Sequence, residues 1–335
     1  MANIICEHPI KAIWSGAYNT ETGKKSLTVV PDTYEPTNNE HVFYIPCGRC
    51  RGCRLHRASV WADRLTAELQ YHDEACFITL TYNDLHLPSR KLYIRDDGQI
   101  DLSPYHSLKL RDFQLFMKRL RKKFKGKKLR YYCAFEYGET NHRPHMHVIL
   151  FGTNFGNDRK PKARINGYMH YESETLNKLW SDHLGLIGYA DICDVSWNDC
   201  AYVARYCMKK SVDSDYVYDS ERYEDLNYVP EFAVMSRRPG IGYQYFTDHA
   251  ADIYDGGSFI ATDTKSVTIK PNKYYDKLFE IANPEYMAHI REQRKERMWQ
   301  AELETRMQTD KTYEERLSEA VVEHFHIEKK LIRSL

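Results

Sequence analysis

The chain has 335 residues, enough for about two domains, and 42% of them are hydrophobic, enough for a packed core. No run approaches the roughly 18 apolar residues of a membrane span, and the first residues lack a signal-peptide layout, so we expect a cytoplasmic protein. The net charge is only +1, so nucleic-acid binding has to be argued from where the charges lie. Nine cysteines without an export signal favour thiols and metal ligands over disulfides.

Three cysteines are clustered in the sequence PCGRCRGC, residues 46–53. Gaps of two residues let neighbouring thiolates converge on one ion, and the intervening glycines permit tight turns. We therefore predict a structural zinc whose ligands are Cys6, Cys47, Cys50 and Cys53. The alternatives for Cys6 are His8, His41 and His56. An iron–sulfur cluster is disfavoured, because its common motif requires a cysteine followed by proline where this chain has Arg57.

Hydrophobic periodicity predicts the elements that follow. In chain order they are a helix over 55–72, a strand at 76–82, a loop with Pro88, Gly98 and Pro104, a helix over 107–125, a hairpin of strands 129–137 and 144–151, a short helix near Trp180 and a strand at 189–195. This β-α-β-β-α-β order is that of the ferredoxin-like, split β-α-β sheet. We expect an α+β fold with an antiparallel sheet.

His145 and His147 are separated by one residue in the second strand of the hairpin. Side chains two apart in a strand share a face, so the two imidazoles lie side by side. Alternation puts Glu136 of the neighbouring strand on the same face, and two imidazoles with one carboxylate suit Mg²⁺ or Mn²⁺. The sequence does not fix the register of the hairpin, so Glu139 and His142 remain alternatives to Glu136.

A Ser-x-x-Asp capping box at 196–199 predicts the start of another helix. On that helix Tyr202 and Tyr206 are four residues apart and Lys209 follows three residues later, so two phenols and one ammonium share a stripe. Tyrosines at this spacing are usually core residues, but beside a histidine pair they become candidate nucleophiles.

Basic residues form two clusters, one at 49–64 and one at 118–130, and the second contains no acidic residue. Unpaired like charges repel unless a polyanion neutralises them, so the second cluster predicts phosphate contact. Residues 211–232 are acidic and are expected to form an exposed loop. Arg237 and Arg238 at a Pro-Gly turn are suited to binding a phosphate. From Pro284 onward we expect an extended helix or a partly disordered tail.

The pairing of H-x-H with Y-x-x-x-Y-x-x-K resembles the HUH endonucleases, which include rolling-circle replication initiators. The surrounding sequence is similar to that of replication initiation proteins of gokushovirus-type microviruses, which are small single-stranded DNA bacteriophages. The stretches that carry this resemblance are Glu136-Tyr137-Gly138, RPHMHVILFG, YVARYCMKK and MSRRPGIG. It covers about residues 1 to 280, and the double-tyrosine motif is its most specific part.

The resemblance implies an enzyme that nicks and rejoins single-stranded DNA at a phage replication origin through a 5'-phosphotyrosine. Tyr202 or Tyr206 attacks the phosphate, and Lys209 steadies the charge. The expected DNA contacts are Thr79, Thr81, Arg143, Arg205, Lys210, Arg237 and Arg238. The expected partners are the phage origin, as single-stranded or supercoiled DNA, and a host helicase with its replication machinery; no membrane contact is expected.

We expect four segments: a cysteine knuckle at 1–60, an HUH endonuclease domain at 61–212, a DNA-contacting extension at 213–283 and a charged helical tail at 284–335. Two other functions remain open. One is a single-stranded DNA-binding module without catalysis, and the other is a zinc-organised assembly protein whose histidines are incidental. A covalent DNA adduct distinguishes the enzyme from both, and DNA binding distinguishes the second from the third.

Overall fold

The computed structural model describes residues 6–18, 25–37, 42–138, 140–165, 167–195, 200, 204, 225–261 and 266–333. The chain divides into two compact units. Residues 1–57 with 294–335 form the terminal unit, and residues 58–293 form the central unit. Within the described ranges, no helix has both the length and the apolar character that crossing a membrane requires.

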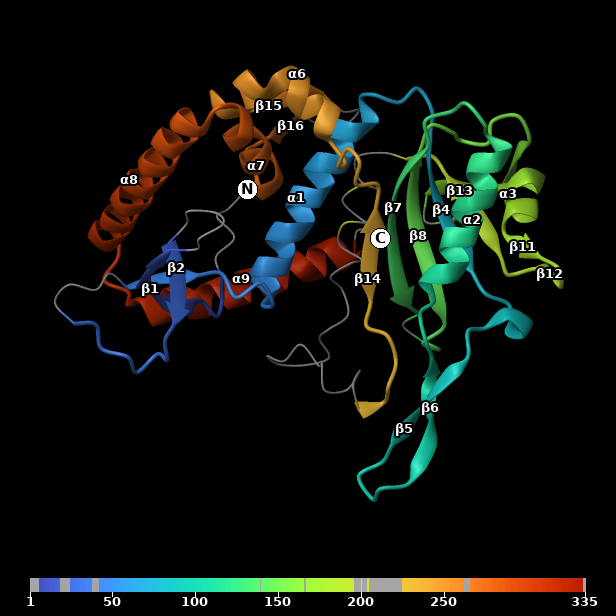
Figure 1. The fold of residues 1–335 in the computed structure, drawn as a ribbon, viewed down its shortest axis with the longest axis horizontal. Helices are drawn as coiled ribbons and strands as arrows, with labels where there is room; N and C mark the ends of the chain where they lie inside the picture. Colours follow the sequence, from blue (N-terminus) through green and yellow to red (C-terminus); the bar gives the residue numbers. More distant parts are fainter. Residues whose placement is uncertain are drawn as a thin grey trace. The chain divides into compact units, whose positions relative to one another are not determined.

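A seven-stranded antiparallel sheet organises the central unit, in the order β14-β7-β8-β4-β13-β10-β9 (Figure 1). Its strands are β4 (Ala75–Thr81), β7 (Arg130–Tyr137), β8 (Pro144–Phe151), β9 (Arg159–Ile165), β10 (Tyr168–Ser173), β13 (Ala190–Cys193) and β14 (Phe232–Met235). The four predicted strands, β4, β7, β8 and β13, lie next to one another in this sheet. The strands at its two ends were not predicted.

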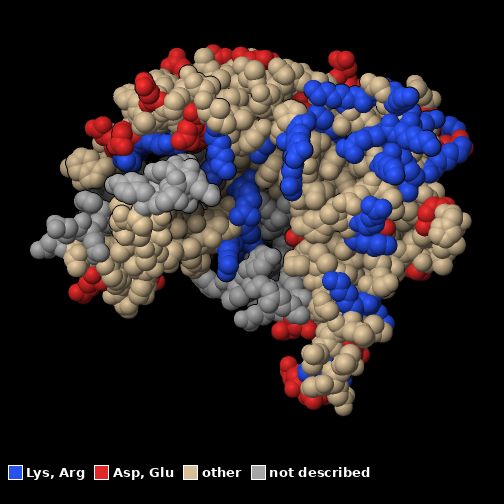
Figure 2. Space-filling view, in the orientation of Figure 1, with Lys and Arg blue, Asp and Glu red and all other residues tan. Residues whose placement is uncertain are grey.

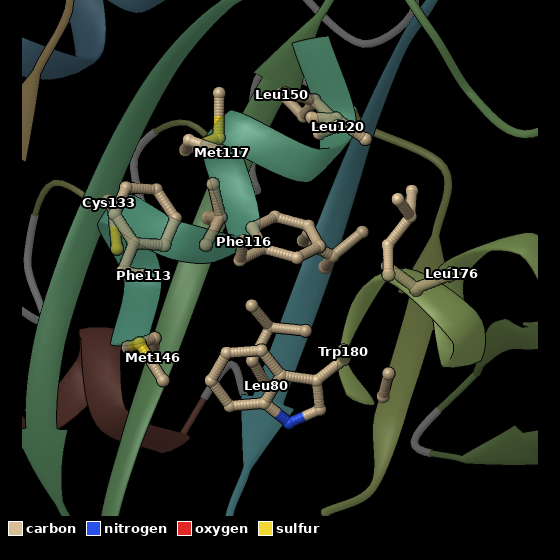
Figure 3. Close-up of a cluster of buried hydrophobic side chains, with 14 of the residues drawn as sticks. Leu80, Phe113, Phe116, Met117, Leu120, Cys133, Met146, Leu150, Leu176 and Trp180 are labelled. Carbon is tan, nitrogen blue, oxygen red and sulfur yellow. The ribbon is translucent and has the colours of Figure 1, made fainter. Parts of the chain in front are cut away.

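One face of the sheet packs against α2 (Leu110–Lys123) and α3 (Glu174–Leu179), both close to their predicted positions. The apolar stripe of α2 is fully buried, and Figure 3 shows Phe113 and Phe116 near Leu80, Met146 and Trp180. Each buried phenylalanine contributes about 1.5–3 kcal/mol relative to exposure, so this layer is the main core of the unit.

The opposite face of the sheet contacts the central-unit part of α1 (Arg51–Leu69) through Ala62 and Leu65. Phe77 lies in the same buried cluster. Cys200 and Ala204, the two described residues of the 196–224 segment, are helical and also buried there. The start of the predicted tyrosine helix is therefore attached to the sheet face opposite α2.

A buried ionic network joins α1 to the 237–242 turn. The Arg130 guanidinium donates to Glu68 Oε1, and the Gly242 N–H donates to Glu68 Oε2 at 2.7 Å. Burial opposes ionisation of Glu68, but hydrogen bonds from His72 and Gly242 and the charge of Arg130 outweigh it and lower the pKa of this carboxyl. The backbone of the turn is held from below, while Arg237 and Arg238 are exposed on it.

We expect Glu68→Gln to destabilise the central unit by about 3–5 kcal/mol, because it leaves the Arg130 charge buried without its partner. A carboxylate with a depressed folded pKa stabilises the fold above its unfolded value of about 4.3 and loses that contribution as pH falls through the folded value. Urea unfolding at pH 7 and at acidic pH measures both effects. Glu74→Gln removes an exposed pair with Lys127 and is the matched control, at about 0–1 kcal/mol. Equal losses in the two variants would contradict the network.

A β-hairpin occupies the region predicted as a loop. Strands β5 (Arg90–Ile94) and β6 (Ile100–His106) are antiparallel and project away from the sheet in Figure 1. The prediction was wrong because Gly98 forms only the turn, with positive φ, and Pro104 lies in a two-stranded ribbon, where a missing N–H is tolerated.

The remaining elements of the central unit pack around Tyr275 and Phe279. They are α6 (Tyr243–Tyr254), β15 (Ser258–Ala261), β16 (Ser266–Ile269) and α7 (Lys273–Ala282). Two short strands, β11 (Ser181–Asp182) and β12 (Gly185–Leu186), and the turn η1 (Asp84–His86) complete the unit. The helix α8 (Pro284–Gln308) begins here and continues into the terminal unit.

The terminal unit contains a three-stranded sheet and the last helix, α9 (Tyr313–Arg333). The strands are β1 (Ile10–Tyr18), β2 (Lys25–Val29) and β3 (Val42–Ile45), in the order β2-β1-β3. Buried His324 of α9 lies 2.7 Å from Glu7, and the same Glu7 oxygen accepts from the Gly52 N–H at 3.0 Å. The helices expected after Pro284 are present, and α9 is folded against the cysteine-rich segment.

Candidate functional site

Glu136, His145 and His147 converge on the sheet face opposite α2. Strand register pairs Glu136 with His145 and Ala134 with His147, as the alternation predicted. Glu136 Oε2 lies 3.8 Å from His145 Nε2, and the two imidazole centroids are 4.9 Å apart. Glu136 is 1% exposed and the His145 side chain 18%, so the group is buried on one side and open on the other.

Neighbouring groups orient both imidazoles. His145 Nδ1 lies 3.2 Å from the Arg143 carbonyl, and His147 Nδ1 lies 3.1 Å from Thr79 Oγ1. The Phe77 ring stacks on His147 at 5.5 Å between centroids. Partners that accept from Nδ1 leave the lone pair on Nε2, which is the usual arrangement around metal-bound histidines. The donor set therefore fits a divalent ion such as Mg²⁺ or Mn²⁺.

Several side chains predicted to contact DNA also have structural partners. Thr81 Oγ1 bonds the Tyr189 backbone at 3.0 Å, and Arg143 donates to Asp84 at 2.7 Å. His142, an alternative third ligand, is exposed and lies against the ring of Tyr105. The predicted residues outside the described part of the chain are Tyr202, Arg205, Tyr206, Lys209, Lys210 and the alternative ligands Glu139 and His41. Most of the acidic segment 211–232 also lies outside it.

The Lys118–Arg130 cluster lies on α2 and the turn that follows it, on the face of the sheet opposite the histidines. Figure 2 shows lysine and arginine side chains gathered over this region of the central unit. Phosphate contact by this cluster stays a prediction. A strand that occupied the Glu136 face would not cover it without passing around the edge of the sheet.

The four predicted zinc ligands come together in the terminal unit, with Cys6 in the fourth position. The Cys50 and Cys6 sulfurs are 3.8 Å apart and those of Cys47 and Cys53 are 4.0 Å apart. Sulfurs around a tetrahedral zinc, at about 2.3 Å each, lie about 3.8 Å from one another. The arrangement fits structural Zn²⁺.

Backbone amides point at the sulfurs of this cluster. The N–H of Cys50 donates to Cys47 Sγ at 3.3 Å, and the N–H of Glu7 donates to Cys50 Sγ at 3.3 Å. Burial raises the pKa of the Cys47 thiol, but the amides of Cys50 and Arg49 outweigh it and lower this pKa to about 7. Such donors stabilise thiolates, which are the form that binds metal.

The model of a family described as replication-associated protein ORF2 matches residues 75–211, from the first residue of β4 through the double-tyrosine motif. The replication-associated protein ORF2 of Spiroplasma virus 4 is 29% identical over 87% of this chain and 85% of its own length. VP4 of Bdellovibrio phage phiMH2K, another replication-associated protein, is 29% identical over 72% of this chain and 70% of its own. The chain is related to microvirus rolling-circle initiators.

A third relative, the replication-associated protein ORF4 of Chlamydia phage 1, is 30% identical over 51% of this chain and 39% of its own length. No solved structure matches the chain. The resemblance to replication initiators that the H-x-H and double-tyrosine motifs indicated is confirmed. The match of the family model spans β4, β7, β8 and β13, the strands that carry Thr79, Glu136 and the histidine pair.

One group of potential ligands in this microvirus relative was not predicted: His170, Asp191 and Cys193. Asp191 and Cys193 alternate on a predicted strand, so their shared face was visible in the sequence. His170 was missed because β10 itself was not predicted. The role of Thr79 as a partner of His147 was also missed, since cross-strand hydrogen bonds depend on register.

We expect Thr79→Val to weaken Mn²⁺ binding by about 10–100-fold, because it removes the hydroxyl that orients His147 while keeping the branched shape of the side chain. Isothermal titration with Mn²⁺ measures the change. Thr81→Val is the matched control, since its hydroxyl bonds the Tyr189 backbone. If the two variants bind Mn²⁺ equally, Thr79 does not orient the ligand.

We expect Cys50→Ser to lose one bound zinc and to make residues 6–57 sensitive to proteolysis, because a structural zinc contributes folding free energy directly. Zinc analysis and limited trypsin digestion measure the two effects. Cys76→Ser, at a buried cysteine of the central unit, is the control and should retain the zinc. A zinc-free protein with an intact terminal unit would show that the four thiols act without metal.

Proposed function

We propose that the protein initiates rolling-circle replication by nicking and rejoining single-stranded DNA at a phage origin. The observation that carries the proposal is the convergence of Glu136, His145 and His147 on one open sheet face, within the stretch shared with replication-associated proteins. The adjacent strand order β7-β8-β4-β13 is also that of a ferredoxin-like sheet, which supports the HUH fold expected from the sequence.

The attachment of Cys200 and Ala204 supports a role for the tyrosines that follow them. An α-helix turns 100° per residue, so a helix that buries positions 200 and 204 directs positions 202 and 206 away from that interior. The phenols of Tyr202 and Tyr206 would then be kept out of the core. The anchor lies in the same buried cluster as Phe77, whose ring stacks on His147.

The reaction transfers a phosphoryl group to a phenol. A divalent ion held by Glu136, His145 and His147 would polarise the scissile phosphate and neutralise its charge. The oxygen of Tyr202 or Tyr206 loses its proton and bonds to phosphorus, and the P–O3' bond breaks. The departing 3'-oxygen gains a proton, leaving a 3'-hydroxyl that a polymerase can extend.

The protein remains joined to the strand through its 5'-phosphate. The bond energy is kept in the phosphotyrosine, so rejoining requires no ATP. Lys209, on the tyrosine stripe, would steady the phosphate charge, and the second tyrosine permits a further cleavage while the first still holds its strand. Lys210 and Arg205 would contact the DNA backbone, together with Arg237 and Arg238, which are exposed on their turn.

The four predicted segments take corresponding roles in this proposal. The cysteine knuckle holds structural zinc, the HUH domain carries the chemistry, the extension contacts DNA and the helical tail stabilises the knuckle through His324. The protein would act in the cytoplasm of the host on phage DNA, together with the host helicase and replication machinery that the resemblance implies.

Incubation of the protein with Mn²⁺ and single-stranded oligonucleotides that tile its own phage genome tests the proposal. A protein–DNA adduct that survives denaturation, formed with oligonucleotides from one region, is expected. DNA binding without an adduct would favour the single-strand-binding alternative. Neither binding nor adduct would favour a zinc-organised assembly protein.

A further inference from the structure

A second group of potential ligands lies on the sheet face that carries the histidine pair. His170 of β10 pairs with Cys193 of β13, Asp191 pairs with Thr79, and Thr79 pairs with His147. Directly paired residues of neighbouring strands point to the same face. At about 4.8 Å per strand, the backbone of Asp191 is about 10 Å from that of His147, so the group is separate from the site described above.

The three side chains converge on one ring nitrogen. Cys193 Sγ lies 3.5 Å from His170 Nδ1, and Asp191 Oδ2 contacts the same nitrogen. In a Cys–His–Asp catalytic relay, the thiol and the carboxylate would face opposite nitrogens of the ring. The geometry therefore does not fit a relay. A sulfur, a nitrogen and an oxygen that meet at one point are instead arranged like the ligands of a metal ion.

The surroundings of the group favour a bound cation with one open side. Cys193 is 6% exposed, whereas the side chains of His170 and Asp191 are each 21% exposed. The other oxygen of Asp191 lies 3.4 Å from Lys162 Nζ, an outer contact that orients the carboxylate without occupying the oxygen that faces the group.

The donor types identify the metal. A thiolate and an imidazole select zinc over Mg²⁺ or Ca²⁺, which prefer oxygen ligands. Three protein ligands leave a fourth position of the tetrahedron for a ligand from outside the protein. We propose that His170, Asp191 and Cys193 bind a zinc ion whose fourth position faces the surface used by DNA. If the proposed function holds, a phosphate oxygen of the bound strand occupies that position.

Zinc content per chain tests this site. Full-length protein is saturated with Zn²⁺ and dialysed into excess Mg²⁺, which competes for the Glu136 site but not for thiolate ligands. Mass-spectrometric metal analysis should show that Cys193→Ser and His170→Ala each retain one zinc fewer than the wild type. His86→Ala removes another histidine–aspartate pair, with Asp182 at 3.2 Å and no thiol in its cluster, and should retain the wild-type amount.

A second readout guards against misfolding of the variants. Co²⁺ bound to the four clustered cysteines gives a tetrahedral absorption spectrum, which should persist in Cys193→Ser and His170→Ala if they are folded. Equal zinc in the wild type and in variants that keep this spectrum would overturn the proposal and leave an ordinary His170–Asp191 ion pair beside a buried thiol. Because zinc is counted without DNA, this result is independent of whether the protein nicks.

The phosphate contact has its own measurement. Binding of a fluorescent single-stranded oligonucleotide, in zinc and without Mn²⁺, should weaken by about tenfold in Cys193→Ser, as for loss of one charged contact. His86→Ala should bind like the wild type. Unchanged DNA affinity in a variant that has lost its zinc would overturn the phosphate contact.

Discussion

Replacement of both Tyr202 and Tyr206 by phenylalanine abolishes covalent attachment to DNA, while each single replacement retains part of it. The phenol oxygen is the atom that bonds to phosphorus, and phenylalanine keeps the ring but has no such oxygen. Either tyrosine can attack in the proposed reaction, so one remaining phenol supports some turnover. Radiolabelled oligonucleotide that remains bound after denaturation measures the adduct.

The control for the double variant is a tyrosine pair elsewhere. Tyr274 and Tyr275 are also adjacent phenols, but Tyr275 is buried and donates to the Gly242 carbonyl, so only Tyr274→Phe is a mild change. It should leave the adduct intact. Full adduct formation in the Tyr202→Phe, Tyr206→Phe double variant would assign the nucleophile to another residue and contradict the proposed chemistry.

Glu136→Gln and His147→Ala each reduce Mn²⁺-dependent cleavage by about 10³-fold, because the loss of a ligand removes roughly 4 kcal/mol of charge stabilisation at the phosphate. The glutamine keeps the size of Glu136 and removes its charge, so the effect reports on metal binding and not on packing. Single-turnover cleavage of an origin oligonucleotide over a range of Mn²⁺ concentrations measures it.

His142→Ala provides the comparison for these variants. His142 lies on the same hairpin but is exposed and contacts Tyr105, so cleavage should stay close to the wild-type rate. Partial rescue of Glu136→Gln at high Mn²⁺ is also expected, since weaker binding is overcome by concentration. Cleavage by Glu136→Gln at the wild-type rate in low Mn²⁺ would show that this carboxylate is not a ligand.

The heart of the site was predictable because it depends on local periodicity. His145 and His147 share a face by alternation, and the same alternation selected Glu136 on the neighbouring strand. The sequence left the hairpin register open, and the pair Glu136–His145 decides it. The four cysteines were also predictable, because the spacing of three of them is itself the signal of a metal knuckle.

The edges of the sheet and the long-range contacts were not predictable in this way. β9 is charged, contains Pro161 and is almost wholly exposed, so it lacks the apolar alternation that marks a strand. Without β9 and β10, His170 could not be placed beside Cys193. The contact of Glu7 with His324 joins residues 317 positions apart, and no local pattern specifies such a pair.

Peptide mapping of the trapped adduct tests the central claim most directly. The protein is incubated with Mn²⁺ and an origin oligonucleotide, denatured, digested with nuclease and protease, and analysed by mass spectrometry. The account predicts a nucleotide 5'-phosphate on a peptide that contains Tyr202 or Tyr206, and none when His145 and His147 are both replaced by alanine. A nucleotide on any other residue, or an adduct that persists without the two histidines, would contradict it.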